Sequence, residues 1–112
     1  MRFPSIDARQ RYWPIHLHEM EEGDYVIFAI VKWGDGSIHA TMAYRPPAAD
    51  MVYTAPLTTE KSRMDKSGEQ GTYWWWNGSY DKPTCEPSFG CPARPPYDWH
   101  GWLRNGRWEA AE

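Results

Sequence analysis

Aliphatic residues are scarce in this chain. Leu, Ile, Val and Phe together supply only 14 of its 112 residues, a fraction that by itself is typical of disordered proteins. Two features oppose disorder. Eight tryptophans and seven tyrosines provide large apolar rings, and a net charge of -3 is too small to hold the chain open by repulsion. We therefore expect a folded domain with a largely aromatic core.

The chain also lacks a long apolar run and a cluster of basic residues. Its longest apolar run, residues 25–31, has the length of a strand and falls far short of the roughly 20 residues that cross a bilayer. Residues 1–5 lack the apolar segment of a signal peptide. Affinity for a polyanion needs clustered Lys and Arg. We therefore predict a cytoplasmic protein with no membrane partner and no general nucleic-acid binding.

Turn signals between short apolar segments predict a chain built from β-hairpins. Residues 25–33 and residues 37–44 flank Gly34-Asp35-Gly36, which tolerates the left-handed backbone of a tight turn. The first arm is almost continuously apolar, so we expect it in the middle of a sheet with both faces covered. His39 in the second arm belongs to the more polar face, opposite an apolar face formed by Ile38, Ala40, Met42 and Tyr44.

Weaker signals complete the predicted fold class, which is mostly β. Residues 12–18 alternate and predict an edge strand near Pro14, and Asn105-Gly106 predicts a type I′ hairpin between residues 98–103 and 107–109. We expect a small single-domain antiparallel sheet with hairpins and little helix. The domain, 1–112, would comprise an N-terminal strand and central hairpin (1–57), a polar loop or short helix (58–71) and an aromatic β-unit (72–112).

The last third of the chain concentrates the residues that could form a metal site. It holds both cysteines and six of the eight tryptophans. Cys85, Cys91 and His100 are ligand types that zinc prefers, and His16 or His18 could complete the set. The spacing differs from the Cys-x-x-Cys of a zinc knuckle, because Cys85 and Cys91 are six positions apart. Buried thiols and a hydrogen-bonded His100 are therefore the preferred interpretation, with zinc as the alternative cofactor.

The same segment offers a candidate for thiol catalysis. Cys91 could act as nucleophile, His100 as base and Asp98 as the group that orients the base. Pro92 directly follows Cys91, so the thiol would not start a helix whose N-terminus lowers a thiol pKa. We therefore predict no catalytic residues from this arrangement.

Aromatic side chains that escape burial would form a binding surface. Trp, Tyr and Arg dominate the energetically important residues of protein interfaces, but a chain with so few aliphatic residues must use most of its rings in the core. A few rings would remain at a surface that contacts a protein partner. The predicted binding residues are Trp74, Trp76, Trp102 and Arg104.

A sequence motif runs through this last third. It consists of Trp-x-Trp-Asn-Gly at 74–78, Pro-Thr-x-x-Pro-Ser-Phe at 83–89, Cys91, and Trp-His-Gly-Trp-Leu-x-Asn-Gly-x-Trp at 99–108. The motif resembles a family of short proteins without an assigned activity from bacteriophages and bacteria. Members with closely spaced cysteines resemble zinc ribbons, whereas this chain has a lone Cys91 followed by Pro92. The resemblance implies a phage or prophage origin.

These observations together predict a non-catalytic accessory protein. A small acidic domain of phage type would bind a host or phage protein and inhibit a host process or defence. It would act in the cytoplasm of the host cell. The alternatives are a structural component of the virion head, neck or tail, and a zinc-binding or thiol enzyme.

Overall fold

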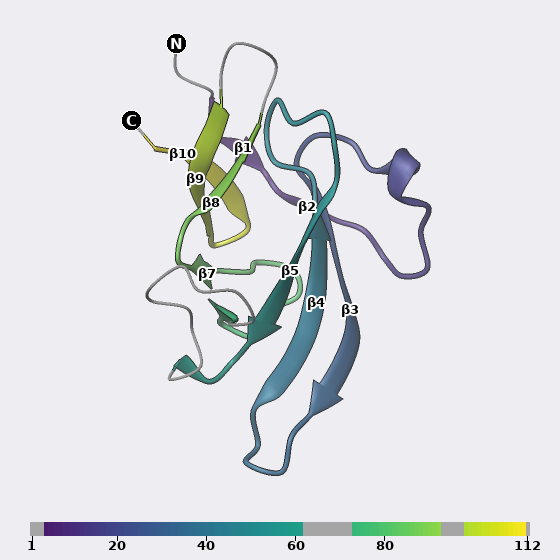
Figure 1. The fold of residues 1–112 in the computed structure, drawn as a ribbon, viewed down its shortest axis with the longest axis vertical. Helices are drawn as coiled ribbons and strands as arrows, with labels where there is room; N and C mark the ends of the chain where they lie inside the picture. Colours follow the sequence, from purple (N-terminus) through teal and green to yellow (C-terminus); the bar gives the residue numbers. More distant parts are fainter. Residues whose placement is uncertain (1–3, 62–72, 93–97, 112) are drawn as a thin grey trace.

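The computed structural model describes residues 4–61, 73–92 and 98–111, and they form two β-sheets (Figure 1). The four-stranded sheet has the order β1-β10-β9-β8 and contains β1 (Ile6–Asp7), β8 (Phe89–Pro92), β9 (Asp98–Arg104) and β10 (Arg107–Ala110). The six-stranded sheet has the order β2-β3-β4-β5-β6-β7 and contains β2 (Arg9–Gln10), β3 (Asp24–Lys32), β4 (Ile38–Tyr44), β5 (Tyr53–Thr58), β6 (Trp74–Trp76) and β7 (Cys85–Glu86). The predicted fold class is therefore confirmed.

Helical structure in the described ranges is limited to 3-10 turns, namely η1 (Leu17–Glu19) and Lys61 at the end of the first described range. None of the helical structure in those ranges has the length and apolar character that a membrane crossing needs. Neighbouring strands pair antiparallel except β2 with β3 and β5 with β6, which are parallel.

Both predicted hairpins are present, because their turns have the required chemistry. The β3–β4 hairpin closes at residues 33–37 with Gly36 at φ 88°. In the β9–β10 hairpin, Asn105 and Gly106 have φ values of 50° and 74°. Positive φ at both central positions is the mark of a type I′ turn, which matches the twist of the flanking strands.

Two predictions about the first part of the chain are wrong. Residues 12–18 do not form a strand: the chain leaves the sheet after β2, and the Trp13 ring instead stacks on Phe28 with centroids 4.3 Å apart. The second half of β3 is not covered on both faces, since Ile30 and Val31 are 49% and 54% exposed. Beyond Tyr25 this strand has β4 as its only described neighbour, so its outer edge is open.

Each sheet contains strands from both parts of the sequence. The N-terminal β1 pairs with the C-terminal β10, with Ile6 opposite Trp108, and β6 pairs with β5, with Leu57 opposite Trp74. Most of the predicted polar loop, residues 62–71, lies outside the described residues. The topology therefore interleaves the two parts of the sequence.

The main core lies between the two sheets and is aromatic, as predicted. Trp76, Trp99 and Trp108 are fully buried. The centroid of the Trp108 ring lies 5.7 Å from that of Tyr44 in the six-stranded sheet and 5.8 Å from that of Phe89 in its own sheet. Ring contacts thus replace the missing aliphatic contacts and join the two sheets.

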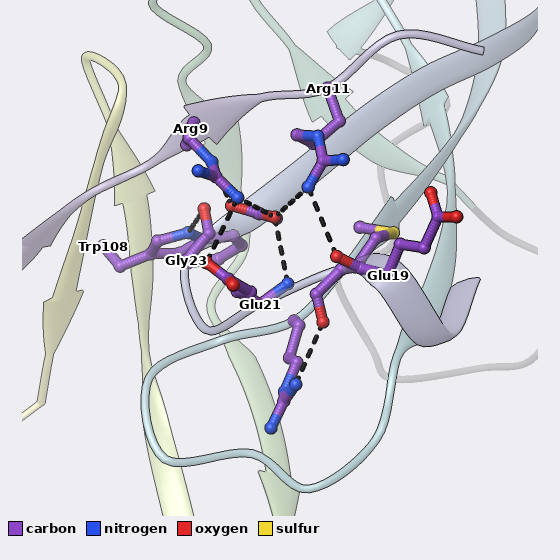
Figure 2. A network of polar contacts seen from close by, with 9 residues as sticks. Arg9, Arg11, Glu19, Glu21, Gly23 and Trp108 are labelled. Carbon is purple, nitrogen blue, oxygen red and sulfur yellow. Dashed lines mark hydrogen bonds and ion pairs between the residues drawn. The ribbon is translucent and has the colours of Figure 1, made fainter. Parts of the chain in front are cut away.

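A buried ionic contact fastens the N-terminal segment to this core. The Asp24 carboxylate is 1% exposed and accepts two 2.8 Å hydrogen bonds from Arg9, one of 2.8 Å from Arg11 and one of 2.9 Å from the Glu21 N–H. Figure 2 shows Arg9, Arg11 and Glu21 near Gly23. The Gly23 carbonyl accepts a 3.1 Å hydrogen bond from the Trp108 indole. The residue before Asp24 is thus hydrogen-bonded to β10 of the four-stranded sheet.

Candidate functional site

Strand β9 presents two different faces. Trp99, Gly101 and Leu103 are buried against the core, whereas the alternate residues His100, Trp102 and Arg104 are exposed or half-buried. This alternation follows from the strand period of two. The second set forms the outer face of the four-stranded sheet, and we call it the outer row.

Ser88 lies beside this row, and its hydroxyl contacts His100. Phe89, the first residue of β8, pairs with Gly101 in the β8–β9 ladder, which brings the preceding residue, Ser88, next to the outer row. The Ser88 Oγ and the His100 Nε2 are 2.7 Å apart, and the contact is exposed. An imidazole nitrogen at this distance can accept the hydroxyl proton, which is the geometry of an activated serine.

Aromatic packing fixes the position of Ser88. Phe89, the next residue, is 1% exposed and stacks on Trp74 with centroids 5.3 Å apart and an interplanar angle of 5°. The Trp74 indole N–H also donates a 3.3 Å hydrogen bond to the Ser88 carbonyl. The hydroxyl is therefore presented to solvent by a backbone that is held on its inner side.

Two glycines shape the surroundings of His100. A Cβ added at Gly90, which pairs with His100, would lie 3.6 Å from the imidazole Cδ2, at ordinary contact distance. A Cβ added at Gly101 would lie 2.1 Å from the Glu109 carbonyl oxygen and 2.8 Å from the Trp99 ring. Glycine at position 101 therefore allows β10 to approach closely behind the histidine.

An open surface pocket adjoins the serine. Its volume is about 360 Å³, and Ser88 lines it together with Glu86, Pro87, Trp102 and Arg104. The Arg104 guanidinium lies 4.4 Å above the Trp102 ring centroid. The Ser88–His100 pair thus has a neighbouring surface on which a substrate segment could rest.

A second serine–histidine contact exists in the molecule, but its geometry does not suit catalysis. The Ser37 Oγ lies 3.0 Å from the His39 Nε2. The same hydroxyl donates a 2.5 Å hydrogen bond to Asp35, so its proton already has an acceptor. Ser37 and His39 are only 7% and 6% exposed, and Trp33 stacks on the imidazole at 3.7 Å. His39 lies opposite the apolar face of β4, as predicted, but covered rather than solvated.

The predicted metal ligands are not brought together among the described side chains. Cys85 is a free thiol, 1% exposed in the core, and His100 binds Ser88 on the outer face. Cys91 pairs with Trp99 in the β8–β9 ladder, but its side chain is not among those that the structure describes. No group of three His, Cys, Asp or Glu residues suited to a metal occurs in the part of the chain that is described. Zinc binding stays a prediction.

The predicted binding residues separate into two groups. Trp102 and Arg104 line the pocket beside Ser88. Trp74 is half-buried, and its indole N–H donates a hydrogen bond to the Ser88 carbonyl. Trp76 is completely buried and donates a 2.8 Å hydrogen bond to the Ser79 carbonyl. A partner-binding role for Trp76 does not fit this position, because its ring is part of the core.

Ser88 is a candidate site residue that the sequence analysis does not single out. It lies within Pro87-Ser88-Phe89, in the same motif as His100, and the register that pairs Phe89 with Gly101 brings both to one face of the sheet. An exposed hydroxyl hydrogen-bonded to an imidazole beside an open pocket is the arrangement found in serine hydrolases.

A comparison with protein families gives this arrangement a context. The model of the family described as bacterial ubiquitination-like system serine protease (BubE) matches residues 35–111. The match covers more than half of the chain, including Ser88 and His100, so the chain belongs to this family. Neither the curated proteins nor the solved structures include a match.

The family match corrects three predictions. It names a serine protease of a bacterial system, so the predicted non-catalytic phage accessory role is wrong, and so is the prediction that the chain is not an enzyme. The predicted viral origin is wrong for the same reason, and so is the prediction that protein binding is the principal activity. The sequence shows no catalytic spacing that would have indicated an enzyme.

Cys85 should be chemically inert in the folded protein. Burial raises the pKa of its thiol to about 12, so at pH 8 it stays protonated, and the thiolate is the reactive form. We expect iodoacetamide at pH 8 to leave Cys85 unmodified in the native protein and to modify it after unfolding in guanidinium. Peptide mapping by mass spectrometry measures this directly, and rapid native modification of Cys85 would contradict the described burial.

Proposed function

We propose that this chain is a serine protease in which Ser88 is the nucleophile and His100 the general base, acting on a protein of a bacterial ubiquitination-like system. The observation that carries the proposal is the 2.7 Å contact between Ser88 Oγ and His100 Nε2 on the exposed outer face. The family match, which spans both residues, supports the same assignment.

The first chemical step would form an acyl-enzyme. As Ser88 Oγ attacks the carbonyl carbon of the scissile amide, His100 Nε2 takes the hydroxyl proton. The tetrahedral intermediate then collapses, the C–N bond breaks, and His100 returns the proton to the leaving amine. An ester between the substrate carbonyl and Ser88 remains.

The second step would restore the enzyme. A water molecule donates a proton to His100 and attacks the ester carbonyl, and the proton passes to Ser88 Oγ as the ester C–O bond breaks. Among the described residues, the His100 imidazole is hydrogen-bonded to Ser88 and to no carboxylate. In the described part of the chain, the proposed site is therefore a dyad, and strand β9 orients the imidazole.

The shape of the site favours a protein substrate with an extended segment. Ser88 and His100 lie on an open sheet face beside a shallow pocket, and a peptide in extended conformation can lie along such a face. The partner would accordingly be a protein that presents an accessible loop or terminus.

Labelling with a fluorophosphonate probe tests the proposed nucleophile. The probe reacts with activated serines, so we expect one adduct on the wild-type protein, mapped by mass spectrometry to Ser88. Ser88→Ala should abolish the adduct, and His100→Ala should slow its formation by about a hundredfold or more, because the base is lost.

Ser37→Ala is the matched control, since it removes the hydroxyl of the other serine–histidine contact. Its labelling at Ser88 should equal that of the wild type. An adduct on Ser37, or no adduct on a folded wild-type protein, would refute the proposed nucleophile.

A further inference from the structure

Arg104 is the charged end of the outer row that begins at the histidine. His100, Trp102 and Arg104 follow one another at alternate positions of β9, so successive members are about 6.6–6.8 Å apart along the strand. Ser88, Trp102 and Arg104 line the same pocket. A substrate bound at Ser88 would therefore contact both Trp102 and Arg104 if it lay along the row.

The guanidinium of Arg104 is held in place and still accessible. Its Cζ lies 4.4 Å above the centroid of the Trp102 ring. Its Nη1 makes a long contact of 3.4 Å with the Glu109 carboxylate, and the Arg104 side chain is 53% exposed. Stacking on an aromatic ring orients the planar group at little entropic cost. The other N–H groups keep the fork geometry that binds a carboxylate through two hydrogen bonds.

The acidic residue that lines the pocket already has a cationic partner. Glu86 is 3.1 Å from the Lys61 ammonium, which itself lies 4.7 Å from the Trp75 ring. Glu109 neutralises Arg104 only in part, because the pair is long and solvated. An incoming carboxylate would therefore meet a cation on the Arg104 side of the pocket.

We infer that Arg104, supported by Trp102, is a specificity-determining residue that selects substrates with an acidic side chain about two to four positions from the scissile bond. The inference rests on the proposed function, because it takes Ser88 as the reacting atom. The distance in residues follows from the length of the row and the rise of an extended peptide, about 3.3 Å per residue.

Peptide binding to the Ser88→Ala variant tests this inference without turnover. Three fluorescein-labelled peptides of about ten residues, identical except for two Glu, two Gln or two Lys in the central positions, are titrated by fluorescence anisotropy. At about 0.1 M salt we expect the Glu peptide to bind about fivefold more tightly than the Lys peptide. Adding Arg104→Glu should reverse this order.

Arg107→Glu, also added to Ser88→Ala, is the matched control. Arg107 pairs with Arg104 across the ladder, but its guanidinium is bound 2.8 Å from Asp7 on β1 and does not line the pocket. The same change of charge there should leave the preference for Glu intact.

Three results would overturn the inference: equal binding of the peptides, no measurable binding of any, or reversal by Arg107→Glu but not by Arg104→Glu. Fluorophosphonate labelling of Ser88 in the protein without the alanine substitution separates this failure from that of the proposed function. A labelled Ser88 without charge preference overturns only the role of Arg104, whereas an unlabelled Ser88 refutes the protease assignment.

Discussion

Replacing His100 with alanine is expected to lower kcat/KM for peptide hydrolysis by about a thousandfold or more. The reason is chemical, since a serine hydroxyl is a weak nucleophile at neutral pH until a base accepts its proton. The 2.7 Å contact with Ser88 places His100 where the proposed base must lie. Combining His100→Ala with Ser88→Ala should add little further loss, because residues that act as one unit are not additive.

His18→Ala provides the matched control for this loss. His18 is an exposed histidine in η1 and lies outside the outer row, so its removal should leave kcat/KM unchanged. Both variants should keep the wild-type melting temperature, because neither imidazole belongs to the core. Rapid hydrolysis by a folded His100→Ala protein would contradict the role of the imidazole as base.

Asp24→Asn is expected to have the largest effect on stability. The side chain keeps its shape but loses its charge, and its amide would direct N–H donors at the donors of Arg9 and Arg11. Hydrogen bonds to a charged group contribute about 1.5–3 kcal/mol each, and the arginines are partly exposed and can recover hydration. We expect a loss of about 2–3 kcal/mol, measured by urea unfolding at pH 7.

The contribution of Asp24 should also depend on pH. Burial alone would raise the pKa of this carboxyl, but hydrogen bonds from Arg9, the Glu21 N–H and Arg11 outweigh burial and lower it. A pKa that is lower in the folded than in the unfolded state stabilises the protein above the unfolded value of about 3.9, and the effect is lost as pH falls through the folded value. The difference between wild type and variant should therefore be largest near neutral pH and shrink below about pH 4.

Asp50→Asn tests whether the loss is specific to the buried carboxylate. Asp50 is exposed, so the same change of charge should alter the free energy of unfolding by less than about 0.5 kcal/mol. A loss equal to that of Asp24→Asn would show that overall charge, rather than the ionic contact, determines stability.

Local signals explain which parts of the fold could be predicted. The β3–β4 and β9–β10 hairpins follow from turn residues that accept positive φ, such as Gly36 and Asn105. Strand β5 carried no such signal, because Pro56 lies within it and proline argues against a paired strand. The exposed half of β3 was mistaken for a buried strand, since an apolar pattern does not record whether another strand lies alongside.

The candidate site depended on contacts that no local signal records. Residue type marks Trp102, Arg104 and His100 as candidates, but among nucleophiles it points to Cys91 rather than to Ser88. Ser88 reaches His100 only through the register of β8 on β9, which pairs Phe89 with Gly101. That register is set by the burial of Phe89 among Trp74, Tyr44 and Trp108, a tertiary contact that sequence spacing cannot provide.

The alternation along β9 makes this sheet a convenient scaffold for protein engineering. Side chains that would meet a substrate and side chains that hold the core occupy strictly separate positions of one strand. A library randomised at Trp102 and Arg104 could therefore sample new cleavage preferences while Trp99, Gly101 and Leu103 remain unchanged. Because the two sets do not share positions, selection for a new substrate would face little of the usual conflict between altered activity and retained stability.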